Sequence, residues 1–234
     1  MAIKFRFTIV FLFILAVFSV AALNVSAATF VVNDVADVQD AVAGDGLCAT
    51  AAASCTLRAA ITESNALAGA DIITLPAGTY TITIAEASDN ANANGDFDIT
   101  SDITINGAGS GTTFVEAATT AGVAIGRVFH IRGLAAATTL VVTIDGLTVR
   151  NGGYPSNTFG GGIRIDQGTS HNVTLSNLVV TNNINQTSGG GISISSATAP
   201  TVSITNCTIT GNRAGGAAAA TSATGAGVQV NVAA

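Results

Sequence analysis

Alternating apolar and polar residues run through most of the chain in short stretches, and these stretches recur at a constant spacing. Residues 172–183 return as residues 201–212, 29 positions later, and residues 160–165 return as residues 189–194 at the same spacing. Residues 142–149 match the first stretch from 31 positions upstream. An apolar side chain at every second position is typical of a strand with one buried face. Two polar residues then interrupt each stretch and reset its phase.

Stacking of the copies is the arrangement that buries their apolar faces. One copy must order about 29 residues around a few buried side chains, so it cannot fold alone, whereas stacked copies share one core. We therefore predict an all-β fold, a right-handed parallel β-helix (solenoid), with the handedness taken from the rule for parallel crossovers. Matching positions form a predicted core ladder, which consists of Val173, Leu175, Leu178, Val180, Val202, Ile204, Cys207 and Ile209.

The alignment of the copies also suggests roles for a cysteine and for two asparagines. Cys207 takes the position of Leu178, so we interpret it as a small buried hydrophobic residue and not as a reactive thiol. Asn183 and Asn212 share a turn position, where stacked amides are expected to hydrogen-bond along the axis. Glycine triplets that begin each copy indicate sharp turns or a close approach of neighbouring rungs.

A segment with helical spacing precedes the repeats. Thr56 can cap the start of a helix and Gly69 can end it. Small or apolar residues share one helical face, namely Leu57, Ala60, Ile61, Ser64 and Ala68. Such a helix would cover the apolar end of the first rung. The predicted organisation is a strand and capping helix at 29–70, followed by rungs at 71–234.

The last rung is expected to be incomplete. The sequence stops in the middle of a rung copy, without a polar cap. We therefore expect truncation at the C-terminus, with further β-helix rungs or a partner covering this end.

The segment 1–28 has the form of a secretory signal. Lys4 and Arg6 precede an unbroken apolar run, small residues follow, and cleavage is expected after Ala27 or Ala28. An uncleaved N-terminal anchor is the alternative, although the run is short for a membrane span. The sequence therefore predicts an extracellular or cell-surface location for the remaining chain.

Charge and cysteine usage narrow the possible partners. Without the signal segment, six arginines stand against fourteen acidic residues, so the sequence has no electrostatic footprint for nucleic acid or anionic lipid. Cys48 and Cys55 lie close together ahead of the predicted helix. In an oxidising compartment, the two cysteines are expected to form a disulfide that closes a small loop.

The sequence around the predicted helix resembles that of a known family. Residues 55–61, Cys-Thr-Leu-Arg-Ala-Ala-Ile, are similar to the CSLREA motif of bacterial secreted and surface proteins. Residues 69–80, 95–100 and 105–109 resemble the segments that accompany this motif, and the resemblance covers about residues 29–212. It implies a pectate-lyase-like β-helix, often within long surface proteins without an assigned activity.

The chain departs from that motif at two positions. Thr56 replaces a serine, which keeps a hydroxyl that can cap the helix. Ala59 replaces a glutamate, so any ion pair that this carboxylate would make with Arg58 or with the first rung is absent.

Stacked carboxylates on the outward face of adjacent rungs would indicate a polysaccharide lyase or hydrolase. Arg164 and Asp166 are expected to point outward together, as a candidate surface pair. One rung later the same positions hold Ser193 and Ser195, so no second carboxylate is expected to join Asp166. We interpret the pair as a solvated ion pair.

A second acidic group lies between residues 96 and 102. Asp96 and Asp98 share a strand face with Asp102 nearby, and the three are candidate Ca²⁺ ligands, with a polar strand edge as the alternative. His130, in a strand, and His171, in a turn beside Ser170 and Asp166, are not expected to be catalytic. The short turn between Asp166 and His171 does not give the geometry of a catalytic triad.

These observations favour a secreted or cell-surface module with a structural or adhesin-like role and without catalysis. The alternatives are a polysaccharide lyase or hydrolase of the pectate-lyase-like class and a non-catalytic carbohydrate-binding module. The expected partners are extracellular glycans or a host or matrix surface, with no nucleic acid and no cofactor other than Ca²⁺.

Overall fold

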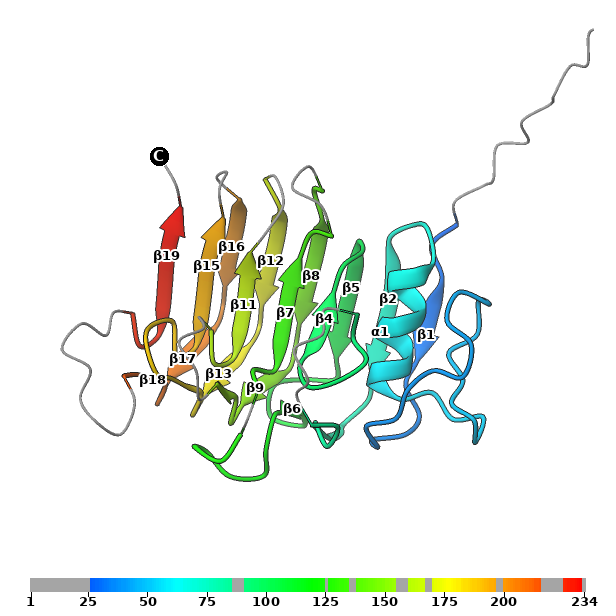
Figure 1. Ribbon diagram of the computed structural model, residues 1–234, viewed down its shortest axis with the longest axis horizontal. Helices are drawn as coiled ribbons and strands as arrows, with labels where there is room; N and C mark the ends of the chain where they lie inside the picture. The colour runs from blue at the N-terminus through cyan, green and yellow to red at the C-terminus, as the bar shows by residue number, and fades with distance from the viewer. Residues whose placement is uncertain are drawn as a thin grey trace, which may run out of the picture.

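The chain forms a parallel β-solenoid of about four turns with one short helix at its N-terminal end (Figure 1). This confirms the predicted parallel β-helix. The computed structural model describes residues 26–85, 91–124, 126–134, 138–154, 160–166, 170–196, 200–215 and 225–232. The predicted signal segment lies outside these ranges except for its end, from Ser26 to Ala28.

Three long sheets form the sides of the solenoid, and all their strand pairs are parallel. The first sheet contains β1 (Thr29–Val31), β2 (Asp71–Leu75), β5 (Ile103–Gly107), β8 (Val141–Asp145), β12 (Asn172–Ser176) and β16 (Thr201–Thr205). The second contains β3 (Gly78–Thr81), β6 (Thr113–Glu116), β9 (Thr148–Arg150), β13 (Val179–Thr181) and β17 (Thr208–Thr210). The third contains β4 (Phe97–Ile99), β7 (Phe129–Arg132), β11 (Ile163–Asp166), β15 (Ile192–Ser196) and β19 (Val228–Val232). A small fourth sheet contains β10 (Gly153–Tyr154), β14 (Ile184–Asn185) and β18 (Arg213–Ala214).

The register of the strands follows the sequence repeat. Val173 lies beside Val202 and beside Val142, the same pairs that the alignment of the copies predicts. In the third sheet, Ile163 lies beside Ile192. Because strand side chains alternate between faces, this register places apolar residues on apolar residues throughout the interior.

The core ladder is fully buried in its first rung and partly exposed in its second. Val173, Leu175, Leu178 and Val180 are at most 1% exposed. Their counterparts Val202, Cys207 and Ile209 are half-buried, and Ile204 is 36% exposed. The reason is that β16 and β17 are the last strands of their sheets within the described residues. Cys207 therefore packs against the core as expected, but it is not fully buried. Covering of this end by further rungs or by a partner remains a prediction.

The polar breaks between strands are left-handed turns. Gly146, Asn177 and Asn206 occupy equivalent corners with φ of 66°, 55° and 52°. Glycine and asparagine adopt this conformation with little strain, which explains why the breaks contain them. At another corner, Asn183 Nδ2 donates to Asn212 Oδ1 at 3.0 Å, so the two amides do stack and hydrogen-bond.

The glycine triplets mark a close approach of rungs. A Cβ on Gly161 would lie 2.6 Å from the carbonyl oxygen of Gly190, and one on Gly190 would lie 2.2 Å from that of Arg213. Side chains at these positions would push the rungs apart immediately before β11 and β15. The triplets therefore hold the third sheet in register.

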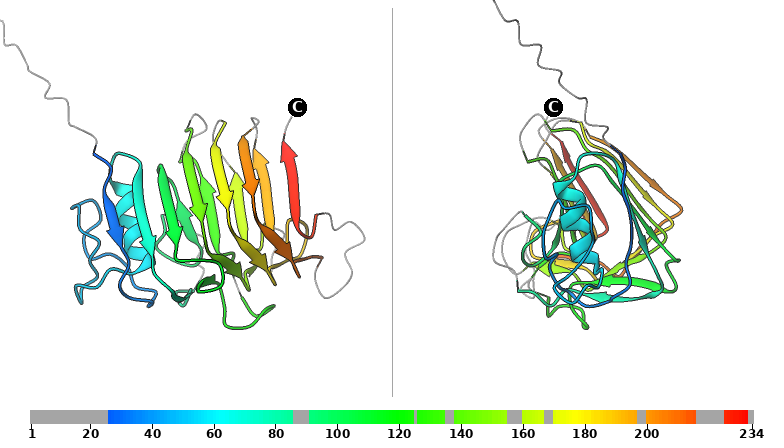
Figure 2. Two further views of the ribbon diagram at one scale, coloured as in Figure 1. Left: turned by 180° about the vertical axis from the view of Figure 1, so that it is seen from behind. Right: turned by 90° about the vertical axis from the view of Figure 1, so that its right-hand side faces the viewer.

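The helix α1 (Leu57–Ala66) lies across the N-terminal end of the solenoid, next to β2 and β4 (Figure 2). Thr56 caps it by accepting a hydrogen bond from the backbone N–H of Ala59. The helix ends before the expected Gly69, because Leu67 is already extended. Ala68 is consequently exposed, whereas the other predicted face residues are buried. Within the described residues, no helix has the length and apolar character needed to cross a membrane.

Arg58 anchors the helix to the first rungs. Its side chain is fully buried, pairs with Asp37, and donates to the carbonyl oxygen of Gly95 at 2.7 Å. The guanidinium also lies 4.8 Å from the centre of the Phe97 ring, a favourable cation–π arrangement. The helix is thus fixed by charge as well as by apolar packing.

A substitution in the core ladder tests the shared interior. Leu178→Ala is expected to lower the free energy of unfolding by about 2–5 kcal/mol, because it leaves a cavity between rungs. The matched control Thr174→Ala changes an outward, partly exposed position on β12 and is expected to cost less than about 1 kcal/mol. Urea denaturation followed by circular dichroism measures both. Equal losses for the two variants would contradict a common dry core at Leu178.

Candidate functional site

The outward face of the third sheet carries a column of polar residues. The strand register places Asp98, His130, Arg164, Ser193 and Gln229 side by side on successive rungs. A neighbouring column holds Arg132, Asp166, Ser195 and Asn231. Neighbouring parallel strands are about 4.8 Å apart, so these side chains are within reach of one another.

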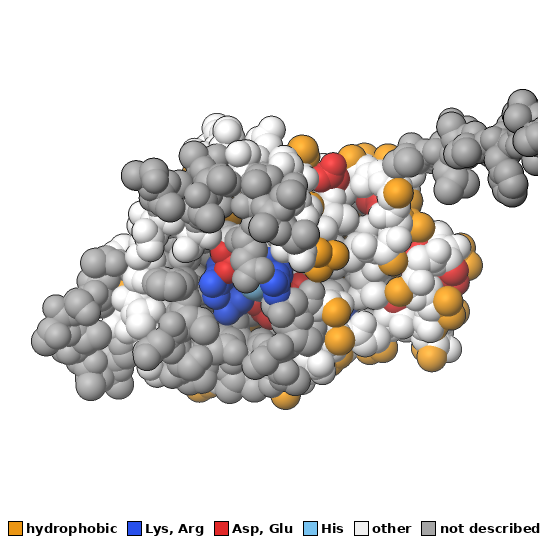
Figure 3. Space-filling view, turned by 45° about the horizontal axis from the view of Figure 1, so that its top comes forward, with side chains coloured by type: hydrophobic (Ala, Val, Ile, Leu, Met, Phe, Trp, Pro, Cys, Tyr) orange, Lys and Arg blue, Asp and Glu red, His pale blue; other side chains and the backbone are white. Residues whose placement is uncertain are grey.

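Six charged or titratable side chains on this face form one connected group, which we call the ionic cluster. Its members are Asp96, Asp98, Arg127, His130, Arg164 and Asp166. In Figure 3, arginine and acidic side chains gather at one place on the visible face. The group joins β4, β7 and β11, which are neighbours in the sheet although each is a full rung away from the next along the chain.

His130 is the centre of the ionic cluster. Its Nε2 lies 2.7 Å from Asp166 Oδ1, and its Nδ1 lies 3.2 Å from Asp98 Oδ1 and 3.9 Å from Asp96 Oδ2. Arg127 Nη1 lies 3.1 Å from both His130 Nδ1 and Asp96 Oδ2. Arg164 Nη2 lies 2.5 Å from Asp166 Oδ2. One imidazole thus connects carboxylates from the rungs on either side of its own.

The ionic cluster is also tied to the helix. Asn92, which is fully buried with φ of 59°, donates its backbone N–H to Asp98 Oδ2 at 3.2 Å. Its side-chain amide donates to the carbonyl oxygen of Arg58 at 3.0 Å. The capping helix and the ionic cluster therefore share one network of polar contacts.

Burial and charge set the protonation of Asp166. Burial alone raises the pKa of this carboxyl, but the hydrogen bond and positive charge of His130, with further help from Arg164 and Arg127, outweigh it. The pKa of Asp166 therefore lies below its ordinary value of 3.8. For Arg164, burial lowers the pKa, Asp166 opposes that effect, and Arg127 adds to it. Arginine still keeps its charge at neutral pH.

The predicted pair Arg164–Asp166 exists, but its surroundings differ from the expectation. Asp166 is 4% exposed and the Arg164 side chain is 19% exposed, so the ion pair is largely buried and not solvated. No carboxylate stacks directly on Asp166, whose strand neighbours are Arg132 and Ser195, but His130 links Asp166 indirectly to Asp98 and Asp96.

The repeat spacing did not reveal this link through His130 because the earlier rungs are irregular in length. The stretches from Phe97 to Phe129 and from Phe129 to Ile163 are both longer than the spacing of the later copies, and they differ from each other. The acids of the first rung were therefore not aligned with Asp166. The available signal was the match between Phe97-Asp98-Ile99 and Phe129-His130-Ile131, which have the same apolar–polar–apolar pattern. This match identifies His130 as an outward neighbour of Asp98.

The three acids proposed as Ca²⁺ ligands do not come together. Asp96 and Asp98 lie close to each other, but the third residue with a ligand atom nearby is His130. Asp102 belongs to another side of the solenoid, where its Oδ1 accepts a hydrogen bond from the backbone N–H of Val141 at 2.8 Å. The chain turns a corner between β4 and β5, which separates Asp102 from the other two.

His171 and the two paired cysteines make contacts that stabilise the fold. His171 is fully buried, and its Nδ1 accepts a hydrogen bond from the backbone N–H of Leu140 at 3.1 Å. Cys48 and Cys55 form a disulfide, with their Cα atoms 5.1 Å apart. The disulfide agrees with the prediction, and it is weak support for a location outside the cytoplasm.

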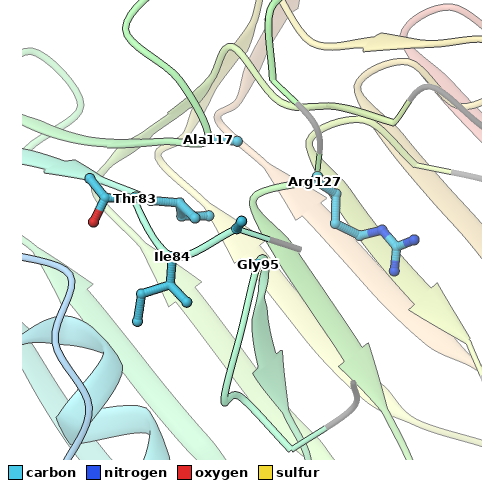
Figure 4. Close-up of a pocket in the computed structure, with 8 residues that line it drawn as sticks. Thr83, Ile84, Gly95, Ala117 and Arg127 are labelled. Atoms are coloured by element: carbon cyan, nitrogen blue, oxygen red, sulfur yellow. The ribbon is translucent and has the colours of Figure 1, made fainter. Parts of the chain in front are cut away.

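A small pocket lies beside the ionic cluster. Its volume is about 100 Å³, and it is lined by Arg127 together with apolar and small residues that include Ile82, Ile84 and Ala117 (Figure 4). Small-molecule sites usually have volumes of about 300–1,000 Å³. The pocket is therefore too small to hold an oligosaccharide, although Arg127 connects it to Asp96 and His130.

The lowered pKa of Asp166 can be tested through stability. Its pKa in the folded chain lies below its unfolded value of about 3.9, so the carboxylate stabilises the fold above about pH 4 and loses that effect as the pH falls through the folded value. The stability difference between the wild-type chain and Asp166→Asn is therefore expected to shrink below about pH 4. Urea denaturation at a series of pH values measures it.

Ser193→Ala is the control for this measurement, because it changes a buried neutral neighbour of Arg164 on the same face. Its difference from the wild-type chain is expected to stay constant over the same pH range. A gap for Asp166→Asn that widens on acidification would contradict the lowered pKa.

Comparison with known proteins gives no relative: no family model, no curated protein and no solved structure matches this chain. The resemblance to CSLREA proteins therefore remains a prediction from sequence. The function has to be argued from the fold and from the ionic cluster.

Proposed function

We propose that this chain is a secreted or cell-surface β-helix module with a structural or adhesin-like role, without catalysis. The resemblance to CSLREA proteins and the signal-like N-terminus support export, and the disulfide between Cys48 and Cys55 is consistent with it. The solenoid supplies long, regular outer faces, which suit contact with extended glycans or with a host or matrix surface.

The observation that carries the non-catalytic part is the double engagement of Asp166. This carboxylate is held by His130 at 2.7 Å and by Arg164 at 2.5 Å, and its pKa is lowered. A general acid at neutral pH needs the opposite, a raised pKa. The neighbouring pocket of about 100 Å³ is also small for a sugar chain. These features suit an ionic lock between rungs better than an active site.

The second candidate is a polysaccharide lyase or hydrolase of the pectate-lyase-like class. One observation favours it: Asp98, His130 and Arg164 form an outward column on three adjacent rungs, with Asp166 beside it. Acids and arginines on neighbouring rungs are the arrangement expected of enzymes with this fold. A carbohydrate-binding module is a third possibility: it would bind polysaccharide as the enzyme does, but without cleaving it.

Incubation with a panel of acidic and neutral polysaccharides separates these functions. We expect no release of reducing or unsaturated ends above that of the heat-denatured protein, because the carboxylates are engaged by cations of the same chain. Affinity electrophoresis in the same polysaccharides measures binding independently of turnover.

If products are released, three variants show whether the release depends on this site. Two of them change the ion pair, Asp166→Asn and Arg164→Gln. The third, Ser195→Ala, is the control on the same face. Product release that the first two variants abolish and the control retains would overturn the non-catalytic proposal. Binding without product would assign a carbohydrate-binding role, which remains within the proposed class of extracellular module.

A further inference from the structure

Three potential metal ligands converge inside the ionic cluster. Asp96, Asp98 and His130 each offer one ligand atom, these atoms all lie within 4.8 Å of one another, and all three residues are buried. His130 Nδ1 is 3.2 Å from the Asp98 oxygen and 3.9 Å from the Asp96 oxygen. In a tetrahedral zinc site with metal–ligand distances of about 2.0–2.2 Å, neighbouring ligand atoms lie about 3.3–3.6 Å apart. The two distances from His130 Nδ1 are close to that spacing.

The contacts of His130 place its Nδ1 towards the two acids. Nε2 lies 2.7 Å from Asp166 Oδ1, a position from which it can donate a hydrogen bond to this carboxylate. On the other side, Arg127 Nη1 lies 3.1 Å from Nδ1, and a guanidinium can only donate. In the neutral imidazole that binds a metal, this contact of Nε2 with Asp166 leaves the lone pair on Nδ1. A carboxylate on the second ring nitrogen is typical of histidines that bind metals.

Asp98 provides the independent observation that points to a cation. Its side chain is fully buried, and Oδ1 receives no hydrogen bond, whereas Oδ2 accepts one from the backbone N–H of Asn92. This Oδ1 lies 3.2 Å from Nδ1 of His130. A buried carboxylate oxygen without a hydrogen-bond donor is costly. A metal ion bound by this oxygen and by Nδ1 removes that penalty.

Arg127 supplies positive charge on one side of this position. Its Nη1 lies 3.1 Å from Asp96 Oδ2 as well as from His130 Nδ1. Arg127 also lines the pocket of about 100 Å³, and in Figure 4 its side chain is directed away from Thr83 and Ile84. The guanidinium therefore has space on the pocket side if a metal ion takes its place among the three acceptors.

We propose that Asp96, Asp98 and His130 form a Zn²⁺ site on the outer face of β4 and β7, with Asp166 as the positioning residue for the imidazole. One nitrogen and two carboxylate ligands suit Zn²⁺. Ca²⁺ takes six to eight oxygen ligands, so this set disfavours it. The site differs from the Ca²⁺ set expected from sequence because His130 replaces Asp102. The metal would link two rungs and displace Arg127 towards the pocket.

Isothermal titration calorimetry of the untagged, chelator-treated full chain with Zn²⁺ tests the proposal, with Ca²⁺ titrated in parallel. A Cys207→Ser background removes the free thiol as a competing zinc ligand. We expect one Zn²⁺ per chain, a rise in the melting temperature on binding, and no competition by Ca²⁺. Asp166→Asn is expected to weaken Zn²⁺ binding by about 10–100-fold, as loss of a partner behind a metal-binding histidine does.

The ligand variants and their control decide the outcome. Asp98→Asn and His130→Gln are expected to weaken binding more than Asp166→Asn does, whereas Asp102→Asn should bind like the wild-type chain. Arg127→Gln should bind at least as tightly, because it removes the competing cation. Circular dichroism checks that each variant folds, and two ligand variants are used in case one does not. Absence of Zn²⁺ binding by the wild-type chain, or unchanged affinity in both ligand variants, would overturn the proposal; weaker binding by Arg127→Gln would overturn the displacement.

Discussion

The structure depends on one constraint, the in-register stacking of parallel strands around a shared apolar interior. Each rung is too short to bury its own apolar face, so its stability comes from the rung before and the rung after it. Because strand side chains alternate, the register that places Val173 on Val202 also aligns every outward residue with its neighbour on the next rung. The core therefore determines the chemistry of the surface: polar residues from distant segments form columns in which neighbouring residues are about 4.8 Å apart.

The ionic cluster is a consequence of that alignment on the third sheet. Burial of charged side chains is costly unless they are paired and hydrogen-bonded, and removal of one partner leaves the other charge uncompensated. His130 solves part of this problem by contacting carboxylates on both sides, and Arg164 engages Asp166 a second time. These contacts hold β4, β7 and β11 together from the outside, while Phe97, Phe129 and Ile163 hold them from the inside.

The same region is joined to the N-terminal helix, so the cluster and the cap form one continuous polar network. Arg58 stacks on Phe97 and bonds to the backbone near Asp96, and Asn92 connects Arg58 to Asp98. A structural role and a metal-binding role are compatible here, because a Zn²⁺ ion between β4 and β7 would strengthen the same rung contacts. A carboxyl that acts as a general acid at neutral pH needs a raised pKa, and Asp166 has a lowered one.

The sequence by itself determined the parallel β-helix, the register of the later rungs, the capping helix and the disulfide. Apolar residues at period two, in copies that recur at a nearly constant spacing, leave one way to bury them all. The sequence also identified Asp96, Asp98, Arg164 and Asp166 as residues of interest, but it placed Asp102 with the first two and left Asp166 without a neighbouring acid. Only the tertiary structure brought His130 and Arg127 between them. The physical reason is that turns of variable length between Phe97, Phe129 and Ile163 lengthen the earlier rungs unequally, so the outward neighbours are decided by strand pairing in space and not by the period of the chain.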